Sequence, residues 1–331
     1  MRPSNELRLA FSATALALVF AACGGKPTAE KNAQGGPTEG AGAAHPTRGC
    51  GLGTSCIPGN DLTAPAAGEG FQIVTPPGMF TVQPGQETFS NYCAVLPNTA
   101  EFDVGRMQSW MPPGSSHELY VFEGPAGNGC DPGNASWIFA ASIPGTIVEL
   151  KMPDGVGVPL QPGTQITLSM HFINTTTTVE QPQVKLNLFG TSNLRYKAAA
   201  MVSFNVMIDI PGATAAGPGV QTVKGTCTAP AGANFFAIGT HTNSRATVAD
   251  VDFYSGGTTT NIVHTTDWQN PDVGVWPVSP FLPVGTGDQF TYSCTYANSG
   301  TTPVRVGESQ AFNELCMTVG YFFPAGSAAC Q

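Results

Sequence analysis

The sequence contains few charged residues and no long hydrophobic run. Charged side chains make up 11% of its 331 residues, and the formal net charge is −9. This acidic balance, with no basic cluster, argues against nucleic acid as a partner. The most apolar stretch, residues 9–22, is too short to span a bilayer. No long amphipathic helical pattern occurs either, so the chain is not expected to form a helical bundle.

Histidines are also scarce, and the cysteines never occur as a CxxC pair. The chain has 5 histidines and 9 cysteines. Without a CxxC pair, a thiolate zinc site is not expected. Eight cysteines follow Cys23, and an even number in an exported chain predicts up to four disulfide bonds. The sequence alone does not choose among their pairings.

The N-terminus has the features of an export signal. Arg2 and Arg8 precede the apolar segment, which ends in Ala21-Ala22 directly before Cys23. Small residues before a cysteine resemble the bacterial lipobox, which predicts cleavage after residue 22 and a lipid on Cys23. The protein is then anchored to a membrane in the bacterial cell envelope, facing the periplasm or the exterior. An ordinary secretory signal followed by a chance cysteine is the alternative.

The rest of the chain divides into a linker and two series of short strands. Residues 23–68 are rich in Gly, Ala, Pro and Thr without periodicity, which predicts a flexible tether. Beyond it, strand-like runs alternate with turns marked by Pro-Gly pairs. The pattern predicts an all-β protein with two antiparallel jelly-roll β-sandwich domains in tandem, residues 69–195 and 196–331.

One strand of the first series carries a histidine within an apolar run. Ile166, Leu168, Met170 and Phe172 alternate with polar residues, so His171 is expected on the face opposite the core. One interpretation is a polar residue on the solvent side of a strand. The other is a metal ligand, because imidazole is the side chain that most often binds metals in proteins.

Several motifs occur in the same order as in a known family. They comprise Glu87-Thr88-Phe89, His117 in its strand, Pro153-Asp154-Gly155, Met170-His171-Phe172, Phe236-Ala237 before His241-Thr242, Asp267-Trp268, Gly307-Glu308-Ser309 and Asn313-Glu314-Leu315-Cys316. With these motifs the chain resembles the copper type II, ascorbate-dependent monooxygenases, such as peptidylglycine alpha-hydroxylating monooxygenase and dopamine beta-hydroxylase. The resemblance implies two jelly-roll domains across a solvent cleft, each with one copper. It also implies a cleft that accepts a small-molecule or peptide ligand.

The resemblance assigns the candidate metal ligands. His117 matches the first histidine of the family's His-His pair, Glu118 stands in place of the second, and His171 matches the third ligand. In the second domain His241 matches the first histidine of a His-Thr-His motif, but Asn243 replaces the second. Copper is therefore expected at the first-domain site and is doubtful at the second. Two histidines and a carboxylate also suit zinc or non-haem iron.

The second-domain site lacks further donors. Leu315 stands where the family has a methionine, so no thioether is present there. Met317 falls on the same strand face as Leu315, so that its thioether is an alternative ligand, although packing in the core explains it as well. His117 and Glu118 converge on one metal only if the strand contains a bulge, since adjacent residues on a regular strand point to opposite faces.

The resemblance also implies three disulfide bonds. These are Cys93–Cys130, Cys227–Cys330 and Cys294–Cys316, and they leave Cys50–Cys56 as a fourth, local bridge.

Two functional hypotheses follow, and the sequence does not decide between enzyme and non-enzyme. The first is a copper-dependent monooxygenase with altered ligands that hydroxylates a small substrate with oxygen. The second is a non-catalytic binding protein or pseudoenzyme on the same scaffold. Gly239 and Val319 stand where the family's peptide hydroxylases have an arginine and a tyrosine that hold the substrate, so peptide amidation is not expected. A surface adhesin or structural lipoprotein is a third, more general interpretation.

Overall fold

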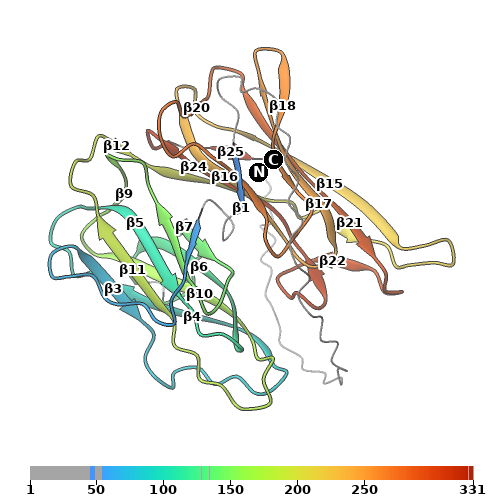
Figure 1. Cartoon of the computed structure of the whole chain (residues 1–331), viewed down its shortest axis with the longest axis horizontal. Coiled ribbons are helices and arrows are strands. Elements are labelled where there is room, and N and C mark those ends of the chain that lie inside the picture. The colour runs from blue at the N-terminus through green and yellow to red at the C-terminus, as the bar shows by residue number, and fades with distance from the viewer. Residues whose placement is uncertain (1–44, 49–53, 128, 134, 327, 331) are drawn as a thin grey trace, which may run out of the picture. The chain divides into compact units, whose positions relative to one another are not determined.

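The computed structural model describes residues 45–48 and 54–330, without 128, 134 and 327, and only the backbone of 45–48. The predicted signal segment, the lipidated Cys23 and Cys50 lie outside the described residues. All regular elements within these residues are β-strands (Figure 1). No helix in the described part of the chain is long and apolar enough to cross a membrane.

The first sandwich consists of two antiparallel sheets. One sheet has the strand order β4-β10-β6-β7, and the other has the order β3-β11-β5, with β8 and β9 both paired to β5. Apolar residues at every second position of the long strands face inward, and Ile166, Leu168 and Phe172 of β10 are fully buried. The strands are β3 (Gly70–Val74), β4 (Glu87–Val95), β5 (Phe102–Trp110), β6 (Ser116–Pro125), β7 (Ser136–Ala141), β8 (Ile147–Lys151), β9 (Val156–Leu160), β10 (Thr164–Ile173) and β11 (Lys185–Gly190).

The second sandwich is built in the same way. Its sheets have the orders β19-β16-β24-β13 and β18-β17-β21-β15. Buried aromatic side chains fill the space between them, with Phe235 stacked on Phe322 and Phe253 on Phe290. The strands are β13 (Ala199–Phe204), β15 (Gly219–Thr228), β16 (Asn234–Thr242), β17 (Ala246–Ser255), β18 (Thr258–Thr265), β19 (Asp272–Val275), β21 (Gln289–Asn298) and β24 (Cys316–Phe323).

The two sandwiches share one connectivity. If β8 and β9 count as one edge position, each domain has eight strands in chain order, with the first, eighth, third and sixth in one sheet. The second, seventh, fourth and fifth form the other sheet. Successive strands, except the fourth and fifth, therefore cross from sheet to sheet, which is the jelly-roll arrangement of two Greek keys. The predicted fold class is confirmed, and the common connectivity reveals a structural repeat that the sequence did not.

Short strands extend this framework. Within the predicted tether, β2 pairs with β8 and β1 pairs with β19, and the side chain of Leu62 is buried. Ordered structure thus begins before the expected start at residue 69. The short strands are β1 (His45–Arg48), β2 (Ser55–Ile57), β12 (Tyr196–Lys197), β14 (Asp209–Ile210), β20 (Leu282–Pro283), β22 (Val304–Val306), β23 (Asn313–Glu314) and β25 (Ala329–Cys330).

Disulfide bonds fasten both sandwiches. The structure contains the three pairings that the resemblance implied, Cys93–Cys130, Cys227–Cys330 and Cys294–Cys316. The last of these joins β21 of one sheet to β24 of the other, so it ties the two layers of the second sandwich together. Cys56 also belongs to a disulfide, whereas its expected partner Cys50 lies outside the described residues.

Apolar side chains from both sandwiches pack against one another. Trp137 of β7 lies against Tyr321 of β24, with 5.3 Å between their ring centroids. Phe236 and Phe323 belong to the same buried cluster. The resemblance implied domains that face each other across solvent, but at this part of the boundary the side chains of the two sandwiches are buried against one another. This packing brings the outer face of the β4-β10-β6-β7 sheet close to the second sandwich.

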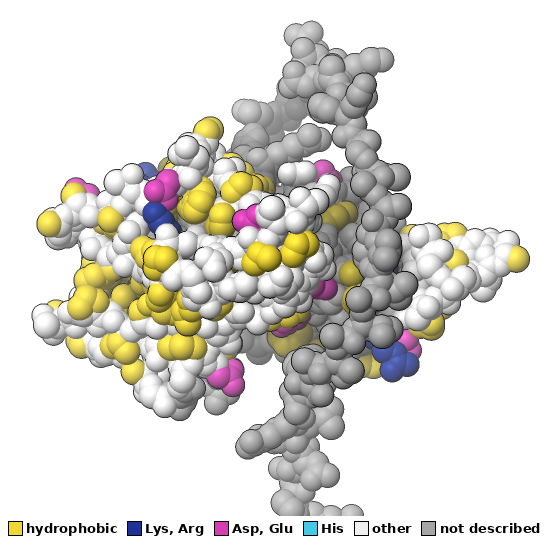
Figure 2. Space-filling model, turned by 90° about the horizontal axis from the view of Figure 1, so that it is seen from below, with side chains coloured by type: hydrophobic (Ala, Val, Ile, Leu, Met, Phe, Trp, Pro, Cys, Tyr) yellow, Lys and Arg dark blue, Asp and Glu magenta, His cyan; other side chains and the backbone are white. Residues whose placement is uncertain are grey.

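The surface reflects the low charge of the chain. The face drawn in Figure 2 carries few charged side chains, scattered among apolar and uncharged polar ones. No cluster of Lys or Arg is visible on this face.

Candidate functional site

The site is centred on a row of side chains that crosses three strands of the first sandwich. In the antiparallel ladder His171 of β10 pairs with Glu118 of β6 on one side and with Phe89 of β4 on the other. Paired residues project from the same face of a sheet, here the face that points away from the core. His171 nevertheless has only 1% of its surface exposed. The prediction of its strand face therefore agrees with the structure, but the interpretation as a solvent-facing residue does not.

A β-bulge brings His117 to the same place. The ladder between β10 and β6 pairs His171 with Glu118 and Phe172 with Ser116, so His117 is the extra residue that has no partner opposite. An extra residue of this kind re-aims the side chains around it. The bulge that the sequence analysis required is present, and it allows the adjacent His117 and Glu118 to point toward one another.

Three potential ligands converge at this bulge. Nδ1 of His117 and Nδ1 of His171 each lie 3.5 Å from a different oxygen of the Glu118 carboxylate. One potential ligand atom from each residue lies within 4.8 Å of the others. The His117 Nδ1 contact with Glu118 lacks hydrogen-bond geometry, so this buried nitrogen has no hydrogen-bond partner in the described structure. An unpaired, buried imidazole nitrogen beside a carboxylate is a suitable metal donor.

His241 of the second sandwich reaches the same carboxylate. Its Nε2 lies 3.2 Å from Oε1 of Glu118, and the side chain is buried. From the sequence, His241 was expected in a separate site of the other domain, without partners. Its contact with Glu118 corrects that expectation, because the two sandwiches meet at this carboxylate.

Tyr120 lies two residues beyond Glu118 on β6, on the same face. Its hydroxyl donates a hydrogen bond to Oε2 of Glu118 at 3.1 Å and lies 3.4 Å from Nε2 of His241. Burial, together with the charge of Glu118, raises the pKa of Tyr120 well above its usual value. Tyr120 is therefore a neutral donor that orients the carboxylate.

The electrostatics of the cluster favour an ionised Glu118. Burial favours its neutral form, but the charge of His241 and the close contacts of Glu118 with His117, His171 and His241 outweigh this effect and hold the pKa of Glu118 well below its usual value. For His171, burial lowers the pKa, but hydrogen bonds to Glu118 and Glu87 raise it to about 9. A buried anion surrounded by imidazoles is a centre that takes up cations, either protons or a metal ion.

Two further carboxylates near the cluster were not recognised as site residues from the sequence. Glu87 at the start of β4 accepts a 2.8 Å hydrogen bond from Nε2 of His171. Glu308 is exposed, but desolvation by the surrounding protein raises its pKa, while the charge of His171 acts in the opposite direction. Both residues belong to motifs that carry the family resemblance, which was the available signal, but no strand periodicity links them to His171.

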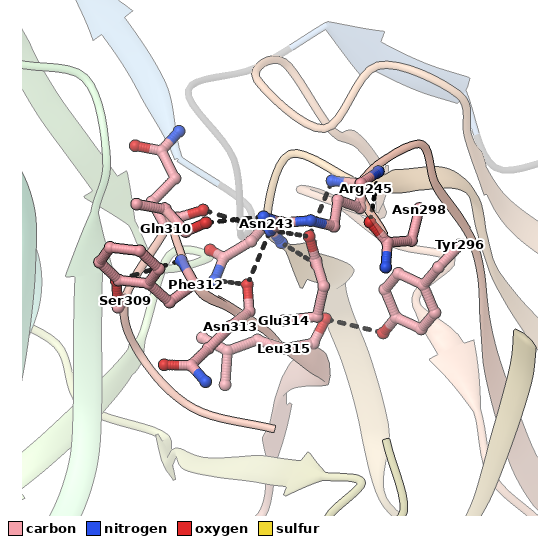
Figure 3. A network of polar contacts seen from close by, with 12 residues as sticks. Asn243, Arg245, Tyr296, Asn298, Ser309, Gln310, Phe312, Asn313, Glu314 and Leu315 are labelled. Atoms are coloured by element: carbon pink, nitrogen blue, oxygen red, sulfur yellow. Dashed lines mark hydrogen bonds and ion pairs between the residues drawn. The ribbon is translucent and has the colours of Figure 1, made fainter. Parts of the chain in front are cut away.

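The second-domain positions of the family's copper ligands do not form a site. The amide nitrogen of the Asn243 side chain donates to the carbonyl of Asn313 at 3.3 Å (Figure 3). Leu315 is buried and offers no donor atom, while its carbonyl accepts a hydrogen bond from Tyr296. Only Met317 remains, which pairs with His241 across the β16–β24 ladder and therefore shares its face.

A buried carboxylate organises the segment before β24 instead. Glu314 accepts hydrogen bonds from the backbone N–H groups of Asn243 and Arg245, at 3.1 and 2.7 Å (Figure 3). The Arg245 guanidinium lies 3.6 Å from Glu314 and donates to the carbonyl oxygens of Ala311 and Asn313. Burial raises the pKa of Glu314 to about 7 despite these donors. This network fixes residues 309–315, the segment that contacts Glu87.

A comparison with protein families identifies the second sandwich. Residues 206–331 match the family described as copper type II ascorbate-dependent monooxygenase, C-terminal domain. The second sandwich is therefore similar to the C-terminal domain of this monooxygenase family. The resemblance seen in the sequence is confirmed there. The monooxygenase match covers the domain that contains His241, Asn243 and Leu315, so the changes at these positions are changes within a family domain.

Comparisons with individual proteins add little to the monooxygenase assignment. No curated protein matches the chain. Among solved structures, the chain is similar to the major capsid protein P2 from bacteriophage PM2, with 10% identity, a TM-score of 0.38, and coverage of 76% of this chain and 97% of the other. It is also similar to a peptide-N(4)-(N-acetyl-β-D-glucosaminyl) asparagine amidase, with 11% identity, a TM-score of 0.39, and coverage of 79% and 99%. At such TM-scores neither likeness carries an argument about function.

The monooxygenase family is copper-dependent, and the two candidate sites fit copper differently. The first-sandwich cluster offers two imidazoles, one of them with an unpaired nitrogen, and an ionised carboxylate, which suits Cu(II). The second-sandwich positions offer one imidazole that already contacts Glu118, and their amide is engaged elsewhere. The residues present therefore fit one metal ion at the first-sandwich cluster and do not fit the family's second copper.

Proposed function

We propose that this protein is a metal-binding lipoprotein of the bacterial cell envelope, built on the monooxygenase scaffold, and that it holds one copper ion at His117, Glu118 and His171. The observation that carries the proposal is the convergence of three potential ligand atoms, one from each residue, within 4.8 Å of one another at the bulge in β6. When bound, the ion would supply a Lewis-acidic centre. With one centre, the protein acts as a binding protein or pseudoenzyme.

The donor types support copper in its oxidised state. Imidazole and carboxylate ligands suit Cu(II), Zn(II) and Fe(II), whereas Cu(I) is favoured by thioether and thiolate sulfur. Every cysteine from Cys93 onward lies in one of three disulfide bonds, so these residues offer no thiolate. The cluster is therefore suited to hold a divalent ion and poorly suited to cycle through Cu(I).

Titration of the full-length chain with Cu(II) tests the proposal. The variants are His117→Ala, His171→Ala and His241→Ala, with His264→Ala as the matched control. His264 is exposed and pairs with Asp250 on β17, outside the cluster. We expect one ion per wild-type chain, no stoichiometric binding after loss of His117 or His171, and normal binding in the control. Circular dichroism checks that each variant is folded, and equal binding in all variants contradicts the proposal.

The position of Met317 favours one alternative function. Because Met317 stands opposite His241 in the ladder, its thioether and the imidazole offer two donors on one face for a second copper. In that case the protein is a copper-dependent hydroxylase with altered ligands, acting on a small molecule between the sandwiches. Two copper ions per chain, one of them lost in both His241→Ala and Met317→Leu, support the hydroxylase. Oxygen consumption with ascorbate as reductant then serves as the activity assay.

The proposed location rests on the sequence before the described residues. Apolar residues 9–22 and Ala21-Ala22 before Cys23 support a lipid anchor. Three disulfide bonds in the described residues agree with an oxidising compartment outside the cytoplasm. Replacing Cys23 with Ser is expected to move the protein from the membrane fraction to the soluble fraction. Membrane retention of this variant, with no acyl chain on the wild type, contradicts the anchor.

A further inference from the structure

The carboxylate of Glu87 accepts hydrogen bonds from residues of both sandwiches. Its Oε1 accepts hydrogen bonds from Nε2 of His171, at 2.8 Å, and from the backbone N–H of Gln310, at 3.1 Å. Its Oε2 accepts a hydrogen bond from the hydroxyl of Ser309, at 2.7 Å. His171 belongs to the first sandwich, whereas Ser309 and Gln310 belong to the second. One carboxylate thus joins a candidate metal ligand to a segment more than two hundred residues away in the sequence.

The contact with Glu87 determines which nitrogen of His171 faces the cluster. With Nε2 bonded to Glu87, Nδ1 is the nitrogen that points to Glu118 and His117. The ring of Phe89 stacks on the imidazole, with 4.2 Å between centroids, and limits its rotation. A histidine that binds a metal through one nitrogen commonly donates the other N–H to a carboxylate, which fixes its tautomer and orientation. Glu87 occupies that position.

The partners of Glu87 in the second sandwich are themselves held firmly. The hydroxyl of Ser309 accepts a hydrogen bond from the N–H of Phe312, and the guanidinium of Arg245 binds the carbonyl of Ala311 at 2.6 Å. Figure 3 shows Ser309, Gln310 and Phe312 beside the Glu314 network. Because this segment is fixed, it presents two donors to Glu87 in a defined geometry.

We propose that Glu87 is a positioning residue for the metal site, and that Ser309 and Gln310 of the second sandwich control the affinity of the first-sandwich site through it. This inference rests on the proposed metal binding by His117, Glu118 and His171. When Ser309 and Gln310 donate hydrogen bonds to Glu87, they fix the orientation of its carboxylate. The carboxylate in turn fixes the orientation of the His171 imidazole. Opening of that contact leaves the His171 imidazole less firmly oriented and weakens metal binding without removing a ligand.

The test combines metal affinity with the protonation state of His171, measured in the full-length chain with Zn(II). The variants are Glu87→Ala, Glu87→Gln and Ser309→Ala. The matched control is Glu149→Ala, because Glu149 is a partly buried carboxylate bonded to Arg106 and Gln108 in the other sheet. Outer partners of metal-bound histidines typically contribute about 10- to 100-fold to metal affinity.

We expect Glu87→Ala to weaken Zn(II) binding by about 10- to 100-fold. Glu87→Gln, whose amide oxygen still accepts the His171 N–H, recovers part of that loss. Ser309→Ala weakens binding less than Glu87→Ala, and the control binds as the wild type does. Long-range ¹H–¹⁵N spectra of the Zn(II)-loaded wild type show His171 protonated at Nε2 and bound to zinc through Nδ1.

The outcomes separate the two proposals. If the wild type binds neither Zn(II) nor Cu(II), the proposed function fails, and this inference fails with it. If the wild type binds Zn(II) and the folded Glu87 variants bind it equally well, Glu87 has only a structural role; the inference is then overturned while the proposed function stands. Binding of His171 through Nε2 overturns the inference as well.

Discussion

The carboxylate of Glu118 in the first sandwich lies 3.2 Å from Nε2 of His241 in the second. Glu118 is 5% exposed and His241 is 9% exposed, so the pair is shielded from solvent. A buried pair of this kind depends on both partners, because the remaining charge is left without compensation when one is removed. The contact therefore makes the candidate metal site part of the boundary between the two sandwiches.

The first prediction concerns the charge of Glu118. Glu118→Gln keeps the size of the side chain but removes the anion that His171 and His241 share, so we expect the free energy of unfolding to fall by about 3 kcal/mol. Glu149→Gln, which weakens a partly exposed pair with Arg106, is expected to change it by less than about 1 kcal/mol. Urea unfolding at pH 7 with a chelator measures both. Equal changes in the two variants contradict the central role of Glu118.

Much of the fold and part of the site follow from local sequence patterns. Alternation of apolar residues along β10 placed His171 on the outer face, and the Pro-Gly turns indicated short antiparallel strands. The bulge at His117 follows from the sequence as a condition for a shared metal site, because two adjacent ligands cannot share a face of a regular strand. The strand face of His171, the turns and the bulge all depend on residues that lie within a few positions of one another in the sequence, so they can be predicted from it.

The remaining parts of the site depend on contacts between distant segments. His241 reaches Glu118, and Ser309 reaches Glu87, only because the second sandwich packs on the first. No periodicity encodes how two domains pack, so His241 was assigned to a separate site. The burial of His171 was not expected either, because the residues that contact its ring, Phe89, Glu87 and His117, come from other strands of the sheet.

Two buried tyrosines of the second sandwich provide a prediction about hydroxyl groups. The Tyr321 hydroxyl is buried with no hydrogen-bond partner in the described structure, whereas the Tyr296 hydroxyl donates to the carbonyl of Leu315 at 2.9 Å. An unpaired buried hydroxyl costs free energy, and a paired one contributes about 1 kcal/mol. Tyr321→Phe is therefore expected to raise the free energy of unfolding or leave it unchanged, and Tyr296→Phe to lower it by about 1 kcal/mol.

Thermal and urea unfolding of the two variants test this difference, with each serving as the control for the other. Both substitutions remove one oxygen atom from a fully buried ring, so loss of packing is closely matched. A loss of stability in Tyr321→Phe as large as that in Tyr296→Phe shows that the Tyr321 hydroxyl has a partner of its own.

The pKa of Glu314 predicts how stability depends on pH. Burial raises this pKa from 4.5 to about 7 in the folded protein. The unfolded chain therefore releases the proton at lower pH than the folded protein does. The contribution of Glu314 to the free energy of unfolding decreases as the pH rises from 4.5 to about 7, and it stays low above that range. The decrease is at most about 3 kcal/mol.

Urea unfolding between pH 4 and 8 measures this slope. In Glu314→Gln the group does not titrate, so the curve of stability against pH is expected to be flatter than that of the wild type between pH 4.5 and 7. The glutamine also loses one acceptor oxygen, but that cost is the same at every pH. Parallel curves for the two proteins mean that Glu314 stays ionised throughout and that the hydrogen bonds from Asn243 and Arg245 outweigh its burial.

The last prediction concerns the disulfide bonds of the second sandwich. Cys227–Cys330 joins residues 103 positions apart, and Cys294–Cys316 joins residues 22 apart. A cross-link that closes a longer loop restricts the unfolded chain more, with an expected contribution of about 5 kcal/mol for the long loop and about 3 kcal/mol for the short one.

The double variant Cys227→Ala/Cys330→Ala is therefore expected to lose more stability than Cys294→Ala/Cys316→Ala. Cys227, Cys294 and Cys316 are fully buried and Cys330 is partly buried, so loss of packing alone favours a slightly larger effect in the short-loop variant, opposite to the expected order. Urea unfolding of both variants under non-reducing conditions measures the difference. A larger loss in the short-loop variant contradicts the loop-length explanation, and it shows that Cys294–Cys316 acts mainly by holding the two layers of the sandwich together in the folded state.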